Sequence, residues 1–422
     1  MGRTVKNRKN YDVKPVQRIE LSDTNVKKRA VAAVLFLLIG AGLLVFCFVN
    51  FLSPGGGWTT VEANRNESDS TEFVFQYFFG ANGANPSAEN KAVTALYNEI
   101  TRTQYCVLNE YEEFDGFVNI CTLNKNPNKE LTVNPLLYKV FSMFAEKNSR
   151  YIYLAPVYEQ YRNLFFCEDD VFLGDFDPIL NSEVRESYKR TLKYVNDPRA
   201  VSIELLGDNK VKLAVSEEYL RYAEEEGISS FIGLLWLKNA FAVDYIAEEM
   251  ASHGYYSGSV SSYDGFVRNF DAYSGTDYSF NLFDMAEGEL YHASAMQYVN
   301  SLSIVYMRNY PMNSLDVQHY YTLKNGEIRT PYLDIADAMP KASLNGLVSY
   351  SKEKSCGEIV LEILPLYIAD SLEENALTAL TEKNINSVYF KEGHKLCYNE
   401  EDLRLSFLYN KDGVSYTGEF VK

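Results

Sequence analysis

Few residues of this 422-residue chain combine the types and spacing that catalysis or metal binding needs. The four histidines, His253, His292, His319 and His394, are far apart, so a histidine metal site is not predicted. The acidic run 168–170, with Asp175 and Asp177 nearby, lacks the alternating ligands and the glycine of a calcium loop and is typical of a solvated loop. Asp244, Glu248 and Glu249 lie about one helical turn apart, a pattern that indicates surface charge.

Sequence motifs name no reaction either. The chain has no phosphate-binding loop, no dinucleotide-binding glycine pattern, no serine nucleophile elbow and no zinc-protease motif. None of its six cysteines forms a Cys-x-x-Cys pair that would bind a metal ion. A Cys106–Cys121 disulfide and buried free thiols are both compatible with the spacing of the five cysteines that follow Cys47.

One segment indicates where the protein lies. Ala30–Leu52 contains 23 residues without a charge, and about 20 apolar residues cross a bilayer as a helix. Residues 1–29 carry about +6 and residues 53–422 about −23, so we expect a basic cytoplasmic tail, which could also touch anionic lipid, and an extracytoplasmic C-terminal part. The net charge of −17 argues against nucleic-acid binding.

The remaining chain must position any site. Residues 53–71, rich in Gly, Ser and Asn, predict a flexible stalk, and no second linker follows, so residues 72–422 are expected to form one large α+β domain. Leu234, Leu237, Phe241 and Tyr245 have helical spacing and should face inward. The strands expected are 73–79, 199–206, 210–214, 302–307 and 388–389, and the helices are 90–103, 135–147, 232–252, 359–368 and 372–380.

Several stretches of the domain occur in the order of a known family. Leu234–Asp244 (LLWLKNAFAVD) is similar to that family's Leu-Gly-Gly-Ile-Ala-Lys-Gly-Tyr-Ala-Val-Asp motif. Tyr111–Asn124, Arg329–Ala338 and Ser355–Leu364 fall where three other motifs belong. Over roughly residues 73–410 the chain therefore resembles the FAD:protein FMN transferases of the ApbE type. The resemblance implies an α+β fold with a flavin cleft, and an enzyme that uses a metal ion to split FAD and attach FMN to an acceptor protein.

This chain differs from the family at the positions that carry the family's catalytic and ligand-binding residues. Its two glycines become Leu235 and Trp236, its lysine becomes Asn239, and its Gly-Gly turn contains Asp264. A Phe-Asp pair becomes Tyr153-Leu154, the family's histidine becomes Tyr332, and Asp334 follows without its proline. The family's metal-binding Asp and Thr become Glu358 and Glu362, which would be metal ligands only in an active enzyme and are otherwise expected to be solvated or paired with Lys or Arg.

These substitutions favour a membrane-anchored extracytoplasmic binding or scaffold protein on a catalytically degenerate flavin-transferase fold. In this reading no cofactor is expected, Leu235 or Trp236 fills the cleft, and the Tyr-rich acidic surface contacts an envelope protein. Two alternatives stay open. One is an active FAD:protein FMN transferase that uses FAD and Mg²⁺, and the other is an unrelated envelope receptor for a small ligand.

Overall fold

The computed structural model of the chain describes residues 56–63, 72–271 and 277–422. These residues all belong to the second of the two units into which the chain divides, Gly55–Lys422. The expected tail 1–29 and membrane span Ala30–Leu52 lie outside the described residues. Among the residues that are described, no helix is both long and apolar enough to cross a bilayer.

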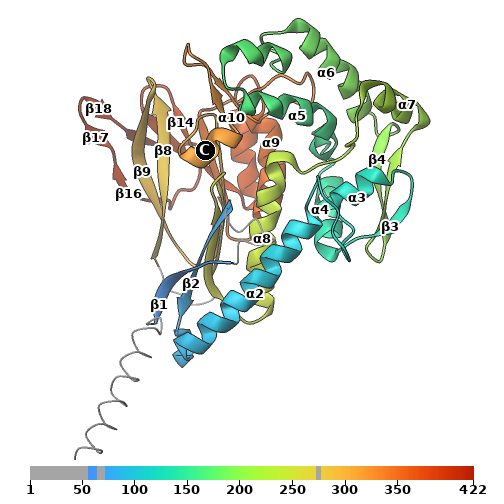
Figure 1. Ribbon diagram of the computed structural model, residues 1–422. Coiled ribbons are helices and arrows are strands. Elements are labelled where there is room, and N and C mark those ends of the chain that lie inside the picture. Colours follow the sequence, from blue (N-terminus) through green and yellow to red (C-terminus); the bar gives the residue numbers. More distant parts are fainter. Residues whose placement is uncertain (1–55, 64–71, 272–276) are drawn as a thin grey trace, which may run out of the picture. The chain divides into compact units, whose positions relative to one another are not determined.

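A nine-stranded sheet forms the centre of this unit (Figure 1). Its neighbours pair antiparallel, except that the last strand runs parallel to the one beside it. In spatial order the strands are β1 (Gly57–Val61), β2 (Phe73–Phe79), β6 (Ser257–Ser262), β7 (Phe266–Asp271), β10 (Leu302–Arg308), β13 (Gly346–Ser351), β14 (Asn386–Lys391), β15 (Lys395–Tyr398) and β19 (Thr417–Phe420).

The two faces of this sheet are covered differently. Four helices, α2 (Pro86–Val107), α4 (Pro135–Glu146), α8 (Lys238–Ser252) and α9 (Cys356–Tyr367), build the larger core against one face, where alternate strand residues such as Phe75 and Val260 are buried. A three-stranded sheet, in the order β16 (Arg404–Leu408), β9 (Glu289–Val299), β8 (Asp277–Ala286), packs on the other face through a second core that contains Leu282, Ile304 and Val348. Figure 1 shows these layers on opposite sides of the central sheet.

Smaller elements complete the unit. A second three-stranded sheet has the order β3 (Glu130–Thr132), β5 (Lys210–Val215), β4 (Val201–Gly207). The other helices are α3 (Ile120–Lys125), α5 (Ala155–Tyr161), α6 (Ser182–Val195), α7 (Glu217–Glu226) and α10 (Glu374–Ala379). The short 3-10 turns that matter for the site are η4 (Arg162–Phe166), η6 (Leu235–Leu237) and η7 (Ser314–Gln318), and the two-residue strands are β11 (Tyr321–Thr322), β12 (Ile328–Arg329), β17 (Asn410–Lys411) and β18 (Val414–Ser415).

Most elements expected from periodicity are confirmed. Strand β2 has the predicted bounds, and α4, β10, α9 and α10 lie within two or three residues of theirs. Leu234, Leu237 and Phe241 are buried and Tyr245 packs against the same core, as their spacing predicted. The five cysteines beyond Cys47 are free thiols, so Cys106 and Cys121 are not joined.

Two predicted elements differ from those in the structure. The stalk predicted over residues 53–71 is interrupted by β1, which pairs with β2 and buries Val61; residues 53–55 and 64–71 lie outside the described part. The alternation of Thr59 and Val61 with outward residues makes this stretch a strand despite its glycines. The helix predicted to begin at Ile232 begins at Lys238, because Leu235 adopts a left-handed conformation with φ of 58°.

The buried carboxylate of Asp244 joins α8 to α9. Its Oδ1 accepts a hydrogen bond from the Cys356 amide at 2.9 Å, and its Oδ2 accepts one from the Gly357 amide at 2.8 Å. These amides belong to the first turn of α9, where helical N–H groups have no partner inside the helix. The interpretation of Asp244 as surface charge is therefore wrong, whereas Glu248 on the same helix does form an exposed ion pair with Lys139. Burial raises the pKa of Asp244 to about 6.

Replacing Asp244 with Ala should lower the free energy of unfolding by about 3 kcal/mol, because two buried amides lose their acceptor. Urea unfolding followed by circular dichroism measures this change. Glu248→Ala on the same helix is the matched control and should change stability by less than about 1 kcal/mol. Equal effects of the two substitutions would contradict the role given to Asp244.

Candidate functional site

Four of the predicted site residues line one cavity of about 190 Å³, which we call the cleft. Leu235, Trp236 and Asn239 come from η6 and the start of α8, and Asp264 comes from the turn between β6 and β7. The cleft is closed by the chain that follows α2, by η4 and by the end of η7. The motif match thus grouped residues up to 29 positions apart in the sequence, and the fold places them at one cavity, at the start of a helix and in a turn between strands.

Trp236 lines this cleft. Its side chain is 7% exposed, and its indole packs edge-on against the Tyr332 ring with 4.9 Å between ring centroids. Tyr332 is itself buried and packs edge-on against Tyr367 at 5.2 Å. Tyr332, at the family's histidine position, therefore supports Trp236 from behind and does not line the cleft. A tryptophan provides on the order of 200 Å² of contact surface, so Trp236 is a large apolar part of the cleft lining.

Glu110 binds backbone amides in the turn that precedes α8. Its Oε1 accepts hydrogen bonds from the Leu234 amide at 2.5 Å and from the Leu235 amide at 3.0 Å. A Cβ at Gly233 would lie 2.7 Å from Glu110 Oε2, so the glycine allows this close approach. Free amides at the start of a helix attract anions such as phosphate. Here a carboxylate of the chain itself accepts from the two amides that come just before α8.

Burial raises the pKa of the Glu110 carboxyl to about 7, against the effect of the two backbone hydrogen bonds. Sequence reasoning missed this residue. It lies 124 residues before Leu234, so no local pattern connects the two. The neighbouring residue Leu235 has a positive φ. The family has a glycine at this position, and glycine adopts a positive φ without strain.

Asn239, Asp264 and His319 form the polar wall of the cleft. Asn239 Nδ2 donates to Asp264 Oδ2 at 2.9 Å. Asn239 Oδ1, Asp264 Oδ1 and His319 Nδ1 are buried and have no hydrogen-bond partner among the described residues. Burial lowers the pKa of His319, which favours the neutral imidazole. The wall can therefore donate and accept hydrogen bonds, but the cation of the family's lysine is absent from position 239.

The other predicted site residues lie in ion pairs away from the cleft. Asp334 contacts Lys341 at 2.7 Å. Glu358 contacts Lys354 at 3.1 Å and accepts a hydrogen bond from the Ser355 amide, as a cap of α9. Although burial opposes the change, these hydrogen bonds lower the pKa of Glu358.

Glu362 is held between two lysines, Lys147 at 2.5 Å and Lys383 at 2.7 Å. Their hydrogen bonds lower the pKa of Glu362 although burial opposes this change. The expectation that Glu358 and Glu362 are paired with lysines is thus confirmed. Within the described ranges, no group of three or more His, Cys, Asp or Glu side chains is placed to hold a metal ion.

The sequence matches no protein-family model and no curated protein. Among solved structures, the fold is similar to the ApbE protein of Thermotoga maritima, with a TM-score of 0.53 and 12% identity over 80% of this chain and 96% of that one. This likeness shows an ApbE-like α+β fold.

Two further structures are less similar. A mutant of the flavin transferase ApbE from Vibrio cholerae has a TM-score of 0.49 and 11% identity, over 82% of this chain and 96% of that one. The apo flavinyl transferase ApbE of Pseudomonas stutzeri has a TM-score of 0.46 and 14% identity, over 76% and 88%.

The raised pKa of Glu110 predicts a pH dependence of stability. The folded chain binds this proton more tightly than the unfolded chain, whose pKa is near 4.5, so the contribution is complete below pH 4.5 and is lost as pH rises to about 7. Urea unfolding across this range should show the wild type losing stability relative to Glu110→Gln, whose amide oxygen can still accept both N–H groups. The exposed Glu112→Gln control should follow the wild type. Parallel curves for wild type and Glu110→Gln would refute the assignment.

Proposed function

We propose that this chain is an extracytoplasmic binding protein, held at the membrane by Ala30–Leu52, on a flavin-transferase fold that does not transfer FMN. The observation that supports this most directly is that the cleft contains the chain's own Trp236 side chain and the carboxylate of Glu110. Both are groups that a flavin nucleotide would have to displace. The apolar segment and the charge difference of about +6 against −23 on its two sides support the topology.

The residues present do not fit FAD. A cavity of about 190 Å³ is smaller than the roughly 300–1,000 Å³ of pockets that enclose drug-sized ligands. Asp264 and Glu72 add two carboxylates to its lining, with the partly protonated Glu110, against Lys238 and Arg162, and an anionic pyrophosphate would be repelled unless a cation screened them. Lys238 lies 3.4 Å from Glu72, so part of its charge is already compensated.

The metal positions do not fit a metal ion either. Glu358 and Glu362 would have to give up three lysine partners before binding a divalent cation. An active flavin transferase is therefore the less favoured reading of the cleft. A binding role uses what the substitutions leave intact, namely the fold and its net negative charge, and we expect the partner to be a protein of the cell envelope. The expectation of a tyrosine-rich surface is wrong, because sixteen of the described tyrosines are buried and only Tyr111, Tyr256 and Tyr263 among them are exposed.

Flavin binding is the decisive measurement. The full chain carrying Trp58→Phe keeps Trp236 as its single tryptophan, so quenching of its fluorescence by FAD in the presence of Mg²⁺ reports on the cleft. We expect a Kd weaker than about 1 mM, or less than about 4 kcal/mol of binding free energy. We also expect no release of AMP, with an active flavin transferase as the positive control. Micromolar affinity or AMP release by this chain would show that the cleft is functional.

The topology is tested separately in cells. Protease added to intact spheroplasts should digest residues 72–422 and leave the basic tail 1–29 protected. A variant with Lys27, Lys28 and Arg29 changed to Glu is the matched control. In this variant a smaller fraction of the molecules should have the large domain accessible to protease, because the positive charges that hold the tail inside are lost. Protection of the large domain in the wild type would reverse the proposed orientation.

A further inference from the structure

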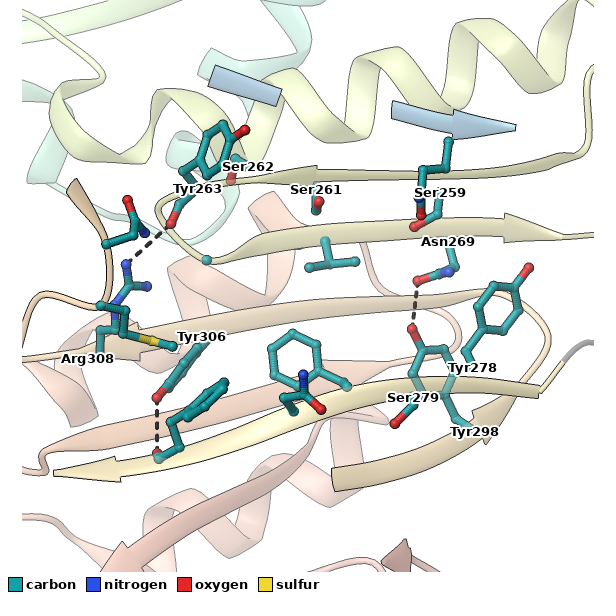
Figure 2. Close-up of a pocket in the computed structure, with 18 of the residues that line it drawn as sticks. Ser259, Ser261, Ser262, Tyr263, Asn269, Tyr278, Ser279, Tyr298, Tyr306 and Arg308 are labelled. Atoms are coloured by element: carbon teal, nitrogen blue, oxygen red, sulfur yellow. Dashed lines mark hydrogen bonds between the residues drawn. The ribbon is translucent and has the colours of Figure 1, made fainter. Parts of the chain in front are cut away.

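A second opening lies on the other face of the central sheet. The three-stranded sheet β16–β9–β8 covers β10, β13 and β14, but β1, β2 and β6 extend beyond it. Side chains of this uncovered part are exposed, including Trp58 at 39% and Phe78 at 37%. Between it and β8 lies a cavity of about 540 Å³, which we call the groove (Figure 2).

The wall of the groove is the edge of a strand. Five consecutive residues of β8, Asp277 to Asn281, line it, although successive side chains of a strand point to opposite faces. A strand presents both sets only where its edge borders the opening. Among the described residues β8 pairs with β9 alone, so this edge has no neighbouring strand.

Other contacts identify which backbone groups point out from that edge. The carbonyl of Phe283 accepts hydrogen bonds from the Tyr306 and Tyr310 hydroxyls, and the carbonyl of Met285 accepts one from Asn345 Nδ2. In an antiparallel pair the outward backbone groups belong to every second residue. Side chains thus occupy the edge at Phe283 and Met285, and a register shift between Leu282 and Phe283 separates that part from Ser279 and Asn281, which line the groove.

The floor of the groove is polar and uncharged. Gln76, Ser259 and Ser261 line it from β2 and β6, and their side chains make no hydrogen bond with another described residue. The one lining cation is Arg308, which is buried and bonded to Asp316 at 2.7 Å. Figure 2 shows Ser259 and Ser261 on one side of the opening, with Tyr278 and Ser279 on the other.

Aromatic rings define one end of the groove. Trp58 packs edge-on against Tyr278 with 5.9 Å between centroids, and Tyr278 stacks on Tyr298 at 5.4 Å. The Tyr298 hydroxyl donates to Asn269 Oδ1 at 2.8 Å, which fixes the rings to the floor. Trp58 is therefore close enough to an occupant to report its binding.

We infer that the groove binds an extended polypeptide segment of a partner protein, which pairs with β8 as a fourth strand of the small sheet. An unpaired strand edge offers alternating donors and acceptors that match another peptide backbone. The short polar side chains of the floor leave room beneath such a strand. Since the groove has no free cation and the domain carries about −23, the segment should be neutral or basic.

A neutral oligosaccharide is the alternative that the lining hydroxyls and rings also suggest. A saccharide has no backbone N–H groups that pair with every second residue of β8. Sensitivity of binding to the position of backbone methylation therefore distinguishes a peptide from a saccharide. The inference extends the proposed binding function to a particular site, but its readout, Trp58, is independent of the cleft and of Trp236.

The full chain in detergent, carrying Trp236→Phe so that Trp58 is its single tryptophan, is used to select from a phage-displayed library of random heptapeptides. Enriched peptides are synthesised and titrated while Trp58 fluorescence is followed. We expect binding that Ser261→Tyr, which fills the floor, weakens at least tenfold. Ser202→Tyr, the same change on β4 of a different sheet, is the matched control and should have no effect.

The second measurement tests strand pairing directly. Methylation of every second backbone nitrogen of the peptide should weaken binding at least tenfold, whereas methylation at the intervening positions should leave it within about threefold. Equal sensitivity at all positions, unchanged affinity in Ser261→Tyr, or no enriched peptide would overturn the inference. A shift of Trp58 fluorescence with chitohexaose, in the absence of peptide binding, would overturn it in favour of a saccharide. Flavin binding to Trp236 would refute the proposed function but leave this result unaffected.

Discussion

The hydrogen bonds from the first turn of α9 to Asp244 are the constraint on which the helical layer depends. They join two helices that are 112 and 113 residues apart at the bonded positions, and they satisfy amides that burial would otherwise leave without acceptors. The approach is close: a Cβ at Gly357 would lie 2.7 Å from the Phe241 ring. Since α8 also packs on β6 and β7, the position of its first turn, and with it the cleft, follows from this contact.

Glu110 binds two amides in the turn before α8, as Asp244 binds two amides in the first turn of α9. Each buried carboxylate accepts two backbone N–H groups, and burial raises the pKa of each. The difference is in what the amides could otherwise bind. Those of α9 face the interior, where only the protein can satisfy them, but those at Leu234 and Leu235 border a cavity. An internal carboxylate at that place competes with any anionic ligand, which connects the packing of the chain to the proposed loss of flavin chemistry.

Sequence periodicity predicted the elements whose buried residues repeat regularly, such as β2 and α4, because burial on one face imposes the pattern. It failed for β1, where five residues lie in a Gly- and Ser-rich stretch and only pairing with β2 makes them a strand. The resemblance to the family, and not periodicity, grouped Leu235, Trp236, Asn239 and Asp264, which line one cavity. Glu110 and the groove could not be found in this way, because each is created by contacts between segments far apart in the chain.

The turn between β6 and β7 separates the two sites. Asp264 extends from it into the cleft, and Tyr263 and Gly265 line the groove. The turn is tightly held: Gly265 has φ of 112°, and a Cβ there would lie 2.3 Å from the Tyr306 carbonyl oxygen, while the Tyr263 carbonyl accepts a hydrogen bond from the buried Arg308. Backbone contacts hold the β6–β7 turn in place. Side chains that face the cleft can therefore change without altering the groove. A fold that loses chemistry on one face of its sheet can therefore keep a binding surface on the other.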